Sequence, residues 1–403
     1  MKKLLSTFLV AFLFMGSVLI HSQEPSHANA QSVSFSDITG HWAESDIKKA
    51  IQHGYIGGYP DGTFRPNATI TRAEYATILS RVTKLENKNS HVMFPDIKGH
   101  WSQESVMKLA ELGFIQASDY PNNFGADRSL TRYEMMKWLS NGLVKSEPSF
   151  EEALDNTKKT LLPTPEIFTG KIAESQIPYI ALVKGTGISE GFEDGTFRLD
   201  KTTTRAEVTS ILLRYADVEG TNARNYKALN ELREVGTTGT NIESLTPYRY
   251  LKNNGIKNNF SVITDKQISL RNNIAIMKLH RMIVVDTANK GSGVYAKLFV
   301  KSISENMKDY YLIFNEISIT SNSNKITVNS MNNSIESSLV SASRIKDDIS
   351  TINHIPTIPL SNVSEFFSKG TTKKVWTMSV IDKNGTASYS LKSDNGDFVG
   401  IYK

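Results

Sequence analysis

One short pattern recurs three times in the first half of the chain, and this internal repeat constrains the fold more than any other feature. Threonine and arginine are followed two residues later by glutamate at Thr71–Glu74, Thr131–Glu134 and Thr204–Glu207. Segments that begin with aspartate and end in histidine-tryptophan precede the first two copies, at 37–42 and 96–101. Such self-similarity is typical of architectures whose single units are too small to bury their own apolar side. We therefore predict three units that pack together, at residues 33–84, 92–144 and 166–216.

Each unit reads as a helix, a loop and a second helix. In the first unit, Ile47, Ala50 and Ile51 are spaced for one face of a helix. A turn follows at residues 59–62, where proline, aspartate and glycine stand together. The repeated motif then predicts a capping box at the start of the second helix, with threonine as the cap and glutamate reaching back. The pairs expected to form these boxes are Thr71 with Glu74, Thr131 with Glu134, and Thr204 with Glu207.

The ordered combination of the three motifs resembles S-layer homology domains, over almost half of the chain. The resemblance implies an α-helical fold, assembled as a pseudo-threefold trimer of repeats. It also implies binding to pyruvylated secondary cell wall polysaccharide and no enzymatic activity. The expected partner is thus an anionic polymer of a Gram-positive-type cell wall, and neither nucleic acid nor a cofactor is expected.

The motif arginines suit such a ligand. Arg72, Arg132 and Arg205 stand at a predicted helix start, where free backbone N–H groups already favour an anion. A guanidinium group adds a fork that matches a carboxylate, such as that of a ketal-linked pyruvate. The alternative is a solvated or salt-bridged role, which the sequence leaves open.

Aromatic, acidic and glycine positions complete the expected binding set. Trp42 and Trp101 offer flat apolar surfaces to a sugar ring, or alternatively form core between repeats. Asp37 and Asp96 can accept hydrogen bonds from sugar hydroxyls, or alternatively serve as caps or turn residues. Glycines beside the turns let the backbone approach a ligand closely. Those glycines are Gly58 and Gly191.

The repeats also differ from one another. The third unit has no His-Trp pair, and Ser175 falls at the tryptophan position by its offset from Arg205. An acidic, proline-containing insertion at 146–165 precedes it, and the second unit lacks the Asp-Gly-Thr-Phe turn. In the family, a groove forms between neighbouring repeats. We therefore expect the pairing of Arg72 with Trp101 to give the most complete groove, and a groove that uses Ser175 to be doubtful.

The N-terminal segment predicts export. Lys2 and Lys3 precede the apolar run 4–20, and a small-x-small sequence ends at Ala30. This is the layout of a secretory signal peptide at 1–30, with an uncleaved membrane anchor as the alternative. No second long apolar segment appears, so we expect no membrane span after cleavage, and a secreted protein held at the cell wall or S-layer surface by binding. The absence of cysteine excludes disulfides, thiolate metal sites and a cysteine nucleophile.

Residues 220–403 indicate a β-rich, α+β domain of unknown function. Short β-prone runs occur at 282–285, 294–300 and 311–314. A three-stranded meander with Asn-Gly hairpin turns is predicted from segments 375–381, 387–391 and 398–402. Helices are expected at 225–235 and 335–349, and a flexible connection at 235–241.

Residues 220–403 contain few candidates for catalytic or metal-binding residues. His280 and His354 lie far apart in sequence, and the common catalytic motifs are missing. The segment 394–397 favours a hairpin turn over a calcium site, so no catalytic or metal-binding residue is predicted. The basic excess of the chain lies here, but it is spread out. We expect an adhesive, structural or partner-binding module that contacts other surface proteins. The alternatives are a wall-associated hydrolase with its catalytic domain in 220–403, and a lattice-forming S-layer subunit.

Overall fold

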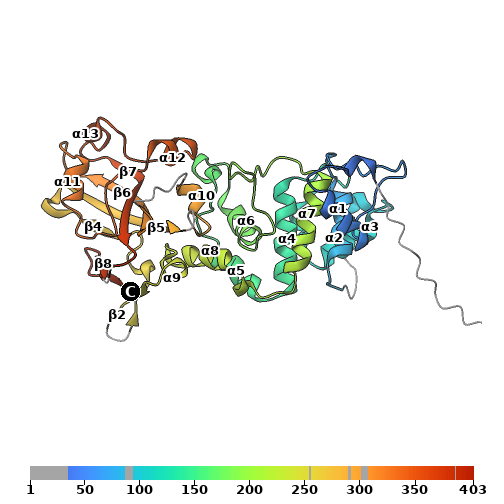
Figure 1. Ribbon diagram of the computed structural model, residues 1–403, viewed down its shortest axis with the longest axis horizontal. Helices are drawn as coiled ribbons and strands as arrows, with labels where there is room; N and C mark the ends of the chain where they lie inside the picture. The colour runs from blue at the N-terminus through green and yellow to red at the C-terminus, as the bar shows by residue number, and fades with distance from the viewer. Residues whose placement is uncertain (1–34, 87–93, 254–255, 289–291, 301–306, 386) are drawn as a thin grey trace, which may run out of the picture.

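The protein is elongated, with helices at one end and sheets at the other (Figure 1). The computed structural model describes residues 35–403, apart from 87–93, 254–255, 289–291, 301–306 and 386. The predicted signal peptide lies outside the described residues. Among the residues that are described, no helix is long and apolar enough to cross a membrane.

The first half is helical, as predicted. Its elements are η1 (Ser36–Ile38), α1 (Glu44–Gln52), α2 (Arg72–Val82), η2 (Pro95–Ile97), α3 (Gln103–Glu111), η3 (Ala117–Asp119), α4 (Arg132–Ser146), α5 (Ser149–Asn156), η4 (Pro165–Thr169), η5 (Glu174–Gln176), α6 (Ile177–Gly185) and α7 (Arg205–Val218). Helices η6 (Ala223–Asn225), α8 (Lys227–Thr238) and α9 (Ile242–Leu245) follow.

Backbone hydrogen bonds join the three units in a closed ring. The N–H of Arg72 donates to Arg128 of the second unit at 2.9 Å. The N–H of Arg132 donates to Lys201 of the third unit at 2.9 Å. The N–H of Arg205 donates to Ala68 of the first unit at 3.0 Å. Because each unit makes the same bond to the next, the units are related by a pseudo-threefold arrangement.

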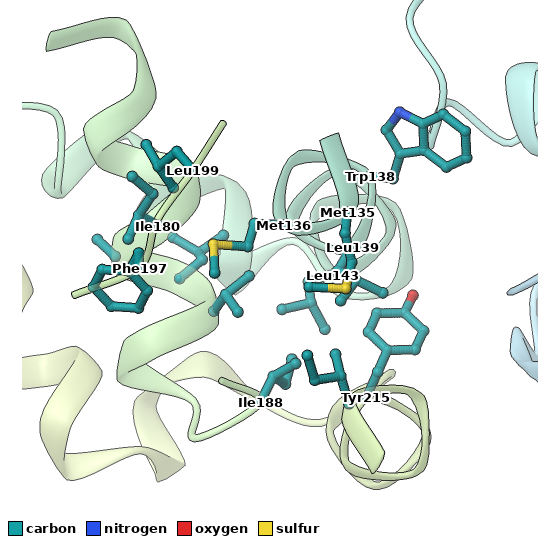
Figure 2. Packing of buried hydrophobic residues seen from close by; sticks show 14 of the residues in the cluster. Met135, Met136, Trp138, Leu139, Leu143, Ile180, Ile188, Phe197, Leu199 and Tyr215 are labelled. Carbon is teal, nitrogen blue, oxygen red and sulfur yellow. The ribbon is translucent and has the colours of Figure 1, made fainter. Parts of the chain in front are cut away.

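Helix α4 lies at the centre of the helical core. Its side chains Met135, Leu139 and Leu143 point toward Tyr215 of α7, while Met136 points toward α6 (Figure 2). These side chains are fully buried, and each contributes roughly 1.5–3 kcal/mol of hydrophobic stabilisation. Gly142 lets α4 approach its neighbours, since an added Cβ would lie 2.1 Å from the Phe114 ring.

The insertion before the third unit is ordered and packs against the helix that follows the repeats. Helix α5 lies within it and contacts α6 and α8. Helix α8 continues to Thr238, so the flexible connection predicted at 235–241 is wrong. Gly236 is needed there because an added Cβ would lie 2.0 Å from the carbonyl oxygen of Asn156. Gly239, with φ of +85°, ends the helix.

The second half contains antiparallel sheets, in agreement with the predicted α+β class. Strands β4, β5, β6 and β7 form one sheet in that order, β1–β9–β8 form a second, and β2–β3 form a hairpin. The strands are β1 (Arg249–Tyr250), β2 (Lys252–Asn253), β3 (Ile256–Lys257), β4 (Gln267–Ser269), β5 (Ala275–Asp286), β6 (Tyr310–Ser321), β7 (Thr372–Asp382), β8 (Tyr389–Lys392) and β9 (Phe398–Tyr402). The short helices are η7 (Phe260–Val262), η8 (Arg271–Asn273), α10 (Ala296–Phe299), α11 (Val328–Asn332), α12 (Asp347–Ile352) and α13 (Val363–Phe366).

The predicted C-terminal meander is wrong in its connectivity. Strands β8 and β9 do pair, but β7 joins β6 in the other sheet. The turn at Asn395 and Gly396 is also longer than two residues, because Lys392 pairs with Phe398 across it. Strand order depends on tertiary packing, which a local turn signal does not specify.

Two further local predictions are corrected. Residues 296–299 form helix α10 instead of a strand, since Tyr295, Leu298 and Phe299 recur at helical spacing and are buried. Of the helix predicted at 335–349, only α12 is present, from Asp347. The rest follows an irregular path over the sheet, where Asn315 donates to the carbonyl of Leu339 at 3.0 Å.

The large sheet contributes side chains from its two faces to two hydrophobic cores. One face, with Ile313 and Val375, belongs to a core within the second half. The other face joins the core of the helical units. There Phe299 stacks on Phe314 with ring centroids 4.4 Å apart, and Phe168 meets the edge of Trp376 at 5.9 Å. The helical and sheet regions therefore share one continuous core.

Candidate polysaccharide-binding grooves

All three motif threonines cap their helices. In α2, the Thr71 hydroxyl accepts the Glu74 N–H at 3.2 Å, and Glu74 accepts the Thr71 N–H at 2.9 Å. The same reciprocal bonds join Thr131 to Glu134 in α4 and Thr204 to Glu207 in α7. Each box holds its arginine at the first helical position.

The motif arginines point into the next unit instead of into solvent. Arg132 donates to the Phe197 carbonyl at 2.8 Å and to Glu207 at 3.0 Å. Arg205 donates to the Phe64 carbonyl at 2.9 Å and lies 3.8 Å from Glu74. Each guanidinium group thus joins a loop and a capping glutamate of the neighbouring unit.

Arg72 follows the same pattern. Its Nη2 lies 2.6 Å from Oε1 of Glu134, and Nη1 donates to the Phe124 carbonyl. Burial lowers the pKa of Arg132, and Glu207 acts in the opposite direction, so the side chain stays charged. The salt-bridged role that the sequence left open is therefore present in the structure. A carboxylate ligand at these arginines would either compete with the capping glutamate or bind beside the existing ion pair.

The tryptophans lie at the surface. Trp42 is 66% exposed and Trp101 is 63% exposed, whereas the other two tryptophans of the chain are buried. Their rings lie beside those of His41 and His100. This exposure contradicts the alternative that they form core between repeats, and it leaves their faces free for a ligand.

The motif aspartates hold the turn loops. Asp37 accepts the N–H groups of Phe64 at 3.0 Å and Arg65 at 2.7 Å. Asp96 accepts those of Phe124 and Gly125 in the same way, at 3.0 and 2.7 Å. Burial alone would raise the pKa of Asp37, but these donors outweigh it and lower the pKa. Both aspartates therefore have the turn-residue role, whatever else they bind.

Glu166 is the equivalent residue of the third unit, and the sequence reasoning missed it. It accepts the N–H groups of Phe197 at 2.6 Å and Arg198 at 3.0 Å. The segment 165–167 reads Pro-Glu-Ile, beside Pro-Asp-Ile at 95–97. That similarity was the available signal, and the longer side chain of glutamate obscured it.

Different structural constraints exclude a side chain at the two candidate glycines. An added Cβ at Gly58 would lie 2.1 Å from the Phe35 ring, so packing within the unit excludes a side chain. Gly191 has φ of +79°, and an added Cβ would lie 2.8 Å from the Thr196 carbonyl oxygen. Only Gly191 lines a groove described below.

A groove of about 460 Å³, which we call the Trp42 groove, opens where the first and third units meet. Arg132 of the second unit reaches it as well, with its guanidinium 4.5 Å from the centroid of the Phe192 ring. The groove is lined by Trp42, Asn67, Arg132, Ser189, Glu190, Gly191, Phe192, Thr204, Glu207, Ile211 and Arg214. It differs from the expected pairing of Arg72 with Trp101, because the motif arginine that lines the groove with Trp42 comes from the second unit.

The third unit presents no tryptophan. Ile172, two residues after Gly170 as Trp42 is after Gly40, is buried, and Ser175 is a small exposed side chain of η5. That a groove using Ser175 binds poorly or not at all therefore stays a prediction. In the described residues, no group of three or more His, Asp or Glu side chains is arranged to hold a metal ion.

Comparison with known proteins agrees with this geometry. Residues 34–76, 94–136 and 170–209 match the family model of the S-layer homology domain. The repeat module is thus one of the domains found in cell-surface proteins, and the chain carries three S-layer homology domains.

Three relatives show the context in which such domains occur. A cellulosome-anchoring protein of Acetivibrio thermocellus is 35% identical over 31% of this chain and 29% of its own length. An S-layer protein of Bacillus licheniformis is 26% identical over 61% of this chain and 26% of its own. An uncharacterised cell wall amidase of Bacillus anthracis is 27% identical over 38% of this chain and 29% of its own. The protein is a cell-surface protein, and the alignments span less than a third of each relative.

Proposed function

We propose that the protein is anchored non-covalently to the cell wall by its S-layer homology domains, which bind a pyruvylated secondary cell wall polysaccharide. The observation that carries this proposal is the Trp42 groove. An exposed indole there lines the same hollow between units as the cationic side chains of Arg132 and Arg214. Glu190 and Glu207 also line it.

The groove suits an acidic sugar. The indole face of Trp42 packs against the apolar face of a pyranose ring, while Arg214, exposed on α7, binds the ketal carboxylate. Arg132 adds a second positive charge, which is held in place by Glu207. Gly191 keeps the loop backbone free of side-chain atoms at the rim.

The test is sedimentation of the mature protein with purified cell walls. We expect Trp42→Ala and Arg214→Ala each to weaken binding about tenfold or more, because each removes a contact to the same sugar. Arg224→Ala is the control, since Arg224 is 68% exposed and pairs with Glu152 away from the groove. Unchanged sedimentation of both groove variants would reject the groove as the anchoring site.

For residues 220–403 we propose an outward-acting adhesive, structural or partner-binding role. We place the start of this second domain after α8 instead of at residue 220, because α8 packs on α5 and α6 of the repeat region. The sheets beyond α8 then form the part that is presented to other surface molecules.

A second candidate function, a wall-associated hydrolase, is favoured by one cluster on β5 and β6. Nε2 of His280 lies 2.7 Å from the hydroxyl of Ser318, and its Nδ1 is hydrogen-bonded to Asp265. This is the order of groups in a serine nucleophile, base and acid. The cluster lies on a partly exposed sheet face, so anchoring alone remains the first proposal.

A serine-directed fluorophosphonate probe tests the second candidate. A hydrolase predicts covalent labelling at Ser318 that is lost in His280→Ala. Absence of labelling in the folded protein would reject it and would leave the anchoring proposal unaffected.

A further inference from the structure

A second hollow continues from the Trp42 groove along helices α1 and α7. It has a volume of about 710 Å³ and shares Trp42 and Arg214 with that groove. We call it the α1–α7 channel. It is lined by Trp42, Asp46, Lys49, His53, Tyr55, Lys84, Ser210, Leu213, Arg214, Ala216 and Asp217. The two hollows therefore meet at one indole and one guanidinium group.

The channel follows a single stripe of the first helix. Residues 42, 46, 49 and 53 recur at helical spacing and so lie on one face. The stripe spans roughly 16 Å at the rise of an α-helix. That length exceeds one sugar ring and accommodates several rings of an extended chain.

The far end of the channel has a second flat surface. The ring of His53 stacks on that of Tyr55, with centroids 5.2 Å apart and planes inclined by 22°. Lys49 lies between this platform and Trp42 with an exposed side chain. The lining between the two aromatic surfaces carries three cationic side chains and two carboxylates, Asp46 and Asp217. Flat rings with a net positive charge between them suit an anionic polysaccharide.

The second unit differs at the equivalent positions. Between α3 and α2, Lys108, which corresponds to Lys49, donates to the Ser80 carbonyl at 2.7 Å. Ser80 also donates to the hydroxyl of Ser105 at 3.2 Å. The positions of His53 and Tyr55 are taken by Leu112 and by the buried Phe114. The stacked pair of His53 and Tyr55 is thus a feature of the first unit that the second unit lacks.

We infer that the α1–α7 channel is a subsite for the sugars that follow the one bound at Trp42, so that this junction holds a stretch of the anionic chain. The Trp101 side, which lacks the stacked pair of His53 and Tyr55, binds a single acidic unit. This inference rests on the proposed function, because it extends the ligand of the Trp42 groove along the same polymer.

The experiment compares ligand lengths by isothermal titration calorimetry with the mature protein. The probes are a single pyruvylated sugar unit and a wall polysaccharide fragment of several repeating units. We expect wild type to bind the longer fragment about tenfold more tightly per site. In Lys49→Ala and in His53→Ala this gain is lost, while affinity for the single unit is unchanged. Lys48→Ala is the matched control, since Lys48 is the neighbouring lysine on α1 and pairs with Glu44.

The outcomes separate the inference from the proposed function. Binding of the single unit with no gain from length, or a gain that survives both channel variants, would overturn the subsite and leave the anchor intact. Failure of wild type to bind either probe would overturn the proposed function itself. Because Lys49 and His53 are exposed, their substitution leaves the core in place.

Discussion

At the scale of single residues, the motif arginine and glutamate serve more than one purpose. Glu207 accepts the N–H of Thr204 in its own helix and receives Arg132 from the neighbouring unit. The capping role was predictable, because both partners lie within four residues of each other. The ion pair was not, because Arg132 and Glu207 are 75 positions apart and meet only when the ring of units closes.

Removal of Arg132 should therefore destabilise the fold. Arg132 is 4% exposed, and Arg132→Ala removes the hydrogen bonds to Oε1 of Glu207 and to the Phe197 carbonyl. Breaking a buried pair costs about 3 kcal/mol or more. Urea unfolding of the mature protein measures this loss. The exposed pair of Arg224 with Glu152 provides the comparison, and Arg224→Ala should cost less than about 1 kcal/mol. Equal losses of unfolding free energy in the two variants would contradict the role of Arg132 in joining neighbouring units.

A buried carboxyl group should make stability depend on pH. Burial raises the pKa of Glu231 from 4.5 to about 7, although the N–H of Val294 and the amide of Asn241 act in the opposite direction. The folded state binds this proton more tightly than the unfolded state does. Its contribution is therefore fully present below about pH 4.5 and is lost as pH rises toward about 7, by on the order of 3 kcal/mol.

Chemical denaturation at pH 5 and pH 8 tests this dependence. Glu231→Gln removes the titrating group, so we expect a smaller difference in unfolding free energy between the two pH values than in wild type. An identical difference in the variant and in wild type would show that other groups cause the pH dependence.

At the scale of elements, sequence reasoning succeeded where the signal is local and periodic. The helices that begin at Arg72, Arg132 and Arg205 were predictable from their caps. Reasoning failed where tertiary contacts decide the path. The chain at 335–346 stays irregular because the Asn315 amide holds the Leu339 carbonyl, and Asn315 lies on a distant strand.

Close packing of α4 gives a prediction at this scale. Gly142→Ala would place a methyl group 2.1 Å from the Phe114 ring and 2.4 Å from Oη of Tyr215. We expect a loss of about 1–3 kcal/mol from overpacking, despite the better helix propensity of alanine. Gly57→Ala is the control, since nothing lies within 4 Å of its added carbon. Thermal unfolding distinguishes the two, and a variant at Gly142 as stable as wild type would contradict the packing account.

At the scale of the whole molecule, the repeat region and the sheets form one body. Phe168, at the start of the third unit, meets Trp376 of β7, and Tyr295 donates to the Leu161 carbonyl at 2.8 Å. The three units and their motifs were visible in sequence. The junction was not, because its residues come from the insertion and from strands whose order the sequence does not specify.

The most direct test of the anchoring claim is the binding of the mature protein to purified wall polysaccharide before and after chemical removal of the pyruvate ketal. Calorimetry gives the dissociation constant in each case. The account predicts binding that weakens at least tenfold when the ketal carboxylate is removed, because the guanidinium groups at the Trp42 groove lose their anionic partner. Equal affinity for both polysaccharides would contradict it, and would leave the arginines as structural links between the repeats.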